Sequence, residues 1–177
     1  NFQMQKEDSF ILLKLVFEMD QNLSPSRKIF LMEELFERGC TSPFLYLEAW
    51  NSICSDMSLL HRMNRFWAQV FLFAGKEKML TEELVMRLTY LSGYEKTFNE
   101  SLYRAMVMGC EAFPTDDTVE AICKYVMKGN PRKPEYFRWF SAAVDRGIRI
   151  TRLYEYYVET LDTSYRRVLP KPLLMYF

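Results

Sequence analysis

The sequence predicts an all-α protein built as a stack of antiparallel helical hairpins, and its periodicity is the main reason. The six glycines are Gly39, Gly75, Gly93, Gly109, Gly129 and Gly147, and their successive separations are 36, 18, 16, 20 and 18 residues. A helix of about 12–14 residues followed by a turn of about 3–6 residues has this length. Apolar residues recur at helical spacing, and no segment shows the sustained alternation of a strand. We therefore expect more than about 60% of the chain to be helical, with essentially no strand.

Glycines are expected just past the ends of helices. At that position the chain often adopts a left-handed conformation, which glycine reaches without a Cβ penalty. Gly109 is the expected exception, because it lies among apolar residues at helical steps.

Helix-start signals fall where the glycine period requires them. Ser24 and Ser42 are each followed by a proline, which suits an N-cap residue before the first helical position. Residues 97–100 fit a capping box that begins at Thr97, and Thr81 and Thr115 precede acidic residues. These signals predict helices at residues 8–20, 25–38, 43–54, 58–74, 82–92, 98–112, 116–128, 134–146 and 152–162, with a short one after residue 164. Residues 59–74 are apolar nearly all round, so we expect this helix to be covered on several sides.

A repeat of about 36 residues resembles the tetratricopeptide (TPR) and half-a-TPR helical hairpins. Gly109, Ala121 and Tyr125 have the mutual spacing of the small residue, alanine and aromatic residue of the TPR motif. Ala105 and Ala112 depart from it, because they stand where the family favours Trp and Tyr. The resemblance implies a right-handed α-solenoid of about nine to ten helices whose A helices line a concave groove for peptides. The implied A helices are 25–38, 58–74, 98–112 and 134–146, and the implied B helices are 43–54, 82–92, 116–128 and 152–162.

Length and composition predict one domain over residues 1–177. The apolar fraction of 49% and the aromatic fraction of 16% are sufficient for a full core, which argues against disorder. The C-terminal residues 173–177 are all apolar and need covering, so we expect the chain to be a fragment of a longer protein. No apolar stretch reaches the roughly 18 residues that a membrane span needs.

No recognisable catalytic, metal or cofactor site emerges from the motifs. The cysteines Cys40, Cys54, Cys110 and Cys123 contain no C-x-x-C pair, and His61 is the single histidine. We expect reduced thiols, with Cys54, Cys110 and Cys123 among apolar helical neighbours in the core, and therefore a cytoplasmic protein. His61 is interpreted as a structural or surface residue, because no partner set for a general base accompanies it.

The candidate contact surface is the basic, aromatic C-terminal end. Residues 1–127 hold 13 Lys and Arg against 18 Asp and Glu, whereas residues 128–177 hold 10 against 5. The candidate partner-binding residues are Arg138, Arg146, Arg149, Arg152, Tyr154, Arg166 and Arg167. Arginine with aromatic side chains suits RNA or an acidic peptide, and the alternative, which weighs more, is that arginine stems cover apolar helix surface. The missing catalytic motifs and the zero net charge, which argues against nucleic acid as the main partner, predict a non-catalytic scaffold for a peptide or protein. Other domains of a longer chain are further expected partners. An RNA-binding helical repeat is the alternative, and an enzyme is a distant third.

Overall fold

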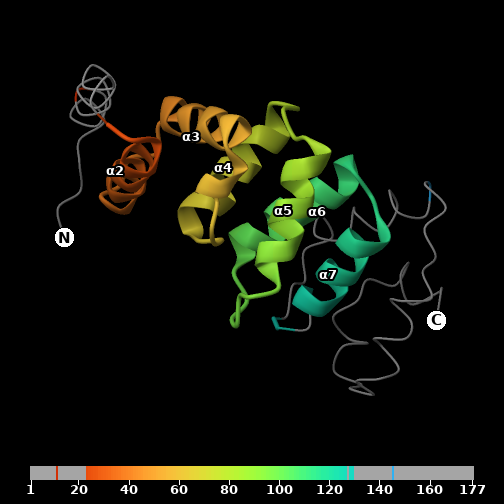
Figure 1. Cartoon of the computed structure of the whole chain (residues 1–177). Helices are drawn as coiled ribbons and strands as arrows, with labels where there is room; N and C mark the ends of the chain where they lie inside the picture. The colour runs from red at the N-terminus through yellow and green to blue at the C-terminus, as the bar shows by residue number, and fades with distance from the viewer. Residues whose placement is uncertain (1–10, 12–22, 127, 130–144, 146–177) are drawn as a thin grey trace. The chain divides into compact units, whose positions relative to one another are not determined.

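The computed structural model describes residue 11, residues 23–126, residues 128–129 and residue 145 (Figure 1). Across these residues every regular element is a helix and none is a strand, which confirms the all-α prediction. The chain divides into two compact units, Asn1–Lys78 and Met79–Phe177. The first unit contains α2 (Pro25–Glu37), α3 (Pro43–Ser55), the 3₁₀ turn η2 (Met57–Leu59) and α4 (Arg65–Lys76). The second unit contains α5 (Glu82–Ser92), α6 (Glu100–Ala112) and α7 (Asp116–Val126).

Helix α4 is the centre of the first unit. Most of its side chains are buried, and α2 and α3 both pack against it. Trp50 of α3 meets Phe71 of α4 edge-on, with ring centroids 5.3 Å apart. Phe66 of α4 packs on Phe36 of α2 at 5.5 Å and on Tyr46 of α3 at 6.3 Å. Burying each such ring contributes about 1.5–3 kcal/mol, so these contacts hold the three helices together.

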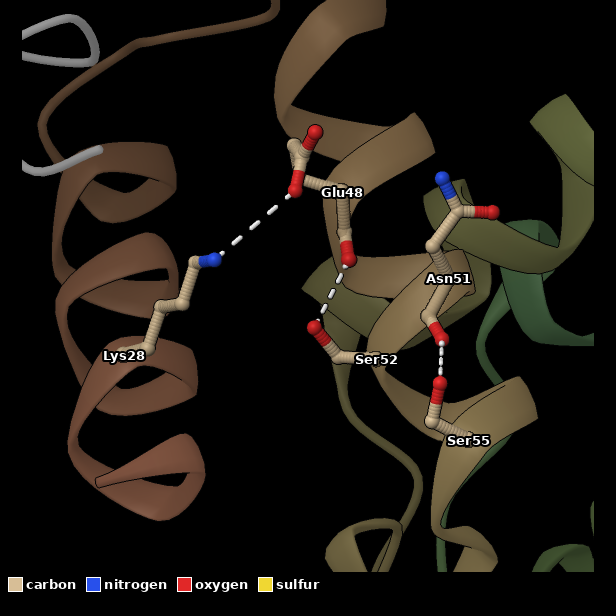
Figure 2. Close-up of polar contacts among 5 residues, drawn as sticks. All are labelled: Lys28, Glu48, Asn51, Ser52 and Ser55. Carbon is tan, nitrogen blue, oxygen red and sulfur yellow. Dashed lines mark hydrogen bonds and ion pairs between the residues drawn. The ribbon is translucent and has the colours of Figure 1, made fainter. Parts of the chain in front are cut away.

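Polar contacts support the packing of α2 on α3. Lys28 of α2 forms an ion pair with Glu48 of α3, at 3.8 Å between Nζ and Oε2, and both side chains are largely buried (Figure 2).

Two serine hydroxyls bond to the backbone within α3. The hydroxyl of Ser52 donates to the carbonyl of Glu48 at 2.8 Å, and that of Ser55 donates to the carbonyl of Asn51 at 3.1 Å. Serines inside this helix therefore satisfy their hydroxyls against the preceding turn.

The end of α2 is a complete Schellman motif centred on Gly39. The N–H of Gly39 donates to the carbonyl of Phe36 at 2.9 Å, and the N–H of Cys40 donates to that of Leu35 at 3.0 Å. Gly39 has a φ of +99°, in the left-handed region. The glycine thus has the predicted role of terminating the helix in a conformation that other residues adopt only at a cost.

The second unit is built around a close approach of α6 to α5. A Cβ added at Gly109 would lie 3.2 Å from Cγ1 of Val85, so the missing side chain brings the two helices together. Tyr125 of α7 is buried, and its hydroxyl accepts from the N–H of Asn99 at 2.8 Å and donates to the carbonyl of Thr97 at 3.3 Å. This tyrosine ties α7 to the start of α6.

Within residues 23–126, the predicted helices agree with the structure to within one or two residues, with one exception. The exception in the first unit is the helix predicted at 58–74, because η2 and an irregular segment replace its first turns and α4 begins at Arg65. Asn64 caps α4, since its Oδ1 accepts from the N–H of Trp67 at 2.9 Å. The prediction of a boundary at Gly75 was also wrong, because this glycine lies within α4.

Caps of the remaining helices agree in part with the predictions. The side chains of Ser24 and Thr81 cap α2 and α5 as expected, whereas Ser42 precedes α3 without a side-chain cap bond. The predicted cap at Thr97 is wrong, because Asn99 caps α6 by accepting from the N–H of Leu102 at 3.0 Å.

Several predicted helices fall on residues outside the described part of the chain. Ile11 is helical within the predicted 8–20, and Asp145 is helical within the predicted 134–146. The helices predicted at 152–162 and after residue 164 lie wholly outside the described residues. The prediction of a single domain over 1–177 stays a prediction.

The Gly39 conformation makes a testable prediction. Gly39→Ala should lower the free energy of unfolding by about 1 kcal/mol, because φ of +99° strains an alanine, while no atom lies within 4 Å of the new Cβ. Urea unfolding followed by tryptophan fluorescence suits the measurement, since Trp50 and Trp67 are both in the first unit.

Arg38→Ala is the matched control for this measurement. Arg38 precedes Gly39 at the same helix end, is exposed, and has an ordinary φ of −86°. Its unfolding midpoint should stay close to that of the natural protein. Equal effects of the two substitutions would show that the left-handed conformation of Gly39 is not what stabilises the helix end.

Candidate functional site

The contact surface predicted from the sequence cannot be compared with the structure. Its residues, Arg138, Arg146, Arg149, Arg152, Tyr154, Arg166 and Arg167, all lie outside the described residues. The basic, aromatic C-terminal end therefore remains a prediction. The described residues instead contain a candidate site that the sequence did not reveal.

This candidate site is a hollow in the first unit, between α2, η2 and the start of α4. Its volume is about 220 Å³, and it is lined by Ser26, Ile29, Phe30, Glu33, Leu59, His61, Arg62 and Trp67. We call it the α2–α4 hollow. Three segments of the chain contribute lining residues, so no single stretch of sequence indicates the hollow.

One face of α2 forms the wall of the α2–α4 hollow. Its lining residues Ser26, Ile29, Phe30 and Glu33 follow the spacing i, i+3, i+4 and i+7, which places them on one side of a helix. Ile29 is 6% exposed and belongs to the core, whereas Phe30 is 57% exposed. An aromatic ring beside a recess, more than half open to solvent, is the most distinctive feature of this wall.

Trp67 is fixed in the hollow by a polar contact across the unit. Its Nε1 donates to Oε1 of Glu33 at 3.1 Å, a bond between residues 34 apart in the sequence. The indole is 2% exposed, and a buried indole N–H usually requires an acceptor. Glu33 therefore both satisfies the indole and links α2 to the first turn of α4.

The cationic side of the hollow comes from the irregular segment between η2 and α4. Leu60 and Met63 are buried and anchor this segment, whereas His61 and Arg62 between them are exposed. The interpretation of His61 as a surface residue is thus confirmed. The hollow combines an apolar wall, one carboxylate engaged with an indole, and an exposed basic pair, an arrangement suited to holding an apolar side chain in a polar surround.

A second hollow lies in the second unit, between α5 and α7. Its volume is about 370 Å³, and it is lined by Thr89, Ser92, Gly93, Asp117, Glu120, Ala121, Lys124, Tyr125 and Lys128. Its lysines interact with neighbouring groups of the same unit. Lys124 pairs with Glu120 at 3.1 Å, and the ammonium of Lys128 donates to the carbonyl of Glu95 and lies 5.4 Å from the Tyr125 ring centroid. Both lysines of this hollow are therefore already engaged with groups of the second unit.

An exposed aromatic pair also lies in the second unit. Tyr90 and Tyr94 are 57% and 67% exposed, their ring centroids are 5.3 Å apart, and their hydroxyl oxygens are 2.7 Å apart. Arg87 lies over the Tyr90 ring at 5.9 Å. Neither tyrosine lines the second hollow.

The four cysteines are free thiols in different surroundings. Cys40, Cys110 and Cys123 are buried, but Cys54 is exposed, which corrects its prediction as a core residue. Burial raises the pKa of the Cys110 thiol to about 11, and burial also raises the pKa of the Cys123 thiol well above its ordinary value. Within the described residues no three His, Cys, Asp or Glu side chains cluster in a way that could hold a metal ion.

These surroundings predict that Cys54 alone reacts with iodoacetamide in the folded protein. Partial burial raises the pKa of its thiol, and the thiolate is the reactive form, so labelling should increase with pH and reach half-maximum above the usual value of about 8.5. Mass spectrometry after timed labelling measures this. Cys54→Ser should abolish native labelling, and comparable labelling of Cys110 or Cys123 would contradict the burial described here.

The comparisons with known proteins identify a family without a known activity. Among the described residues no helix is long and apolar enough to cross a membrane. Neither a curated protein nor a solved structure matches the chain. The model of a family of unknown function, DUF5717 (N-terminal), matches residues 1–177, and the chain therefore belongs to the DUF5717 N-terminal family.

Proposed function

We propose that this protein is a non-catalytic interaction module that holds a segment of a peptide or protein partner in the α2–α4 hollow. One observation carries the proposal. Phe30 remains 57% exposed although it borders a recess lined by the buried side chains of Ile29, Leu59 and Trp67. An apolar side chain from a partner would cover Phe30 and fill the recess at the same time.

The size of the hollow favours a side chain over a small-molecule ligand. Pockets for drug-sized ligands usually measure about 300–1,000 Å³, and the 220 Å³ of this hollow is smaller. Binding energy in protein interfaces is concentrated in a few aromatic and arginine residues around a central pocket. Phe30, Trp67 and Arg62 provide these residue types within one recess.

The proposal includes the TPR-like architecture. The two helices that line the hollow, α2 and α4, correspond to A helices in the TPR-like phasing, and A helices line the peptide groove of that family. The close approach at Gly109 supports hairpin packing of the TPR type. The proposed arrangement is a right-handed solenoid of about nine to ten helices in a cytoplasmic protein.

Substitution of Phe30 tests the proposed site. Short peptides selected from a random displayed library on the natural protein should lose at least about tenfold in affinity on Phe30→Ala, because a tenfold loss needs only about 1.4 kcal/mol. Isothermal titration calorimetry with the selected peptides measures this.

Tyr90→Ala is the matched control, because Tyr90 has the same exposed fraction as Phe30 but lies in the second unit. It should leave the affinity unchanged. A library that yields no peptide, or peptides that bind Phe30→Ala as tightly as the natural protein, would rule out the α2–α4 hollow as a peptide site.

The second candidate function is RNA binding by the basic, aromatic C-terminal end. The excess of 10 Lys and Arg over 5 Asp and Glu in residues 128–177 favours it. If it is correct, affinity for single-stranded RNA should fall steeply between low and moderate salt, because phosphate contacts release counterions. Replacing Arg146, Arg149 and Arg152 together with Ala should reduce both the affinity and the salt slope in a filter-binding titration. Unchanged binding in this variant would remove the basic end from consideration.

A further inference from the structure

We infer that the α2–α4 hollow selects an acidic segment, in which one large apolar side chain is flanked by carboxylates. This inference rests on the proposed function, because it names the partner chemistry of the same site. The apolar side chain would enter between Phe30 and Trp67. The carboxylates would lie over His61 and Arg62.

The charges around the hollow are the first argument for an acidic partner. The lining contains the exposed pair His61 and Arg62 and a single carboxylate, Glu33. Glu33 is half-buried and accepts from the indole of Trp67, so one of its two oxygens is already engaged within the protein. Arg62 is therefore the exposed formal charge of the lining, whereas Glu33 is half-buried, and carboxylates flanking a bound side chain complement this arginine.

The geometry of the irregular segment is the second argument. Leu60 is fully buried and Met63 is 2% exposed, so the backbone on both sides of the basic pair is anchored in the core. His61 and Arg62 consequently project from a held position at the edge of the recess. Because the backbone is already held, binding a partner here requires little further ordering of this segment.

Lysine-flanked segments would meet the opposite situation. Their ammonium groups would lie near Arg62, and a like charge placed against an interface charge disfavours binding. Glu33 could attract one of these ammonium groups, but it is half-buried, whereas Arg62 is exposed at the rim. The charge of the flanks should thus affect affinity even though the apolar side chain provides most of the binding energy.

Paired peptides test the inference on the whole chain. Two fluorescein-labelled peptides carry the same central Phe in a Gly-Ser background, one flanked by Asp on both sides and the other by Lys. Fluorescence anisotropy at low salt should show the Asp-flanked peptide binding about threefold to tenfold more tightly, as expected for exposed ion pairs. The difference should shrink as salt increases, because exposed charges are screened.

Charge reversal at the rim provides the second measurement. Arg62→Glu should remove or invert the preference between the two peptides. Arg62→Gln should reduce the preference, and it replaces the first variant if the reversed charge disturbs folding. Arg38→Glu is the matched control, because Arg38 is an exposed arginine of the same unit that does not line the hollow. It should leave the preference intact.

The possible outcomes separate the inference from the proposed function. Binding of both peptides with equal affinity, or tighter binding of the Lys-flanked peptide, overturns the inference, while loss of that binding on Phe30→Ala would still support the peptide site. A preference that survives Arg62→Glu also overturns the inference. If neither peptide binds and the library yields no Phe30-dependent peptide, both fail.

Discussion

The first unit depends on the burial of α4. Seven of its twelve residues are buried, from Phe66 to Ala74, so one neighbouring helix cannot cover it. Helices α2 and α3 both pack on it, and α2 lies close enough for Glu33 to reach the indole of Trp67. The α2–α4 hollow is a result of this arrangement. Because α4 packs against α2, the first turn of α4 lies beside the face of α2 that carries the exposed ring of Phe30.

The break before α4 gives the hollow its cationic side. The apolar residues between Leu59 and Met63 fit a helix that runs directly into α4. Asn64 is extended instead, with φ of −146° and ψ of −176°, and it caps α4. Its side chain satisfies one of the N–H groups that a helix start leaves without an intrahelical acceptor. The segment between η2 and Asn64 is therefore not helical. Burial of Leu60 and Met63 anchors this segment and leaves His61 and Arg62 exposed between them.

Local signals explain which parts of this fold could be predicted. Helices α2, α3 and α5 were predicted to within a residue because a Ser-Pro or Thr-Glu pair marks each start. The start of α4 was missed because apolar residues on both sides of Asn64 outweighed a single capping residue. The hollow was missed for another reason. Glu33 and Trp67 are 34 residues apart, and helical spacing shows that Ile29 and Phe30 are neighbours without showing that only the first is covered. An acceptor for the indole of Trp67 was the one requirement visible in the sequence, but periodicity does not show which residue supplies it.

Exposure alone does not distinguish a binding residue, since single exposed apolar side chains are common on protein surfaces. Phe30 and Tyr90 show this, because they are equally exposed. Tyr90 has its own partners, with Tyr94 and Arg87 against its ring and its hydroxyl beside that of Tyr94. Phe30 instead borders a recess whose other walls are buried side chains. A single incoming group therefore contacts both the Phe30 ring and those walls. Protein interiors otherwise pack to high density, and a recess of this size beside an exposed ring is a place where added apolar atoms would find contacts on several sides. An exposed ring beside a recess, and not an exposed ring alone, makes the first unit the stronger candidate for binding.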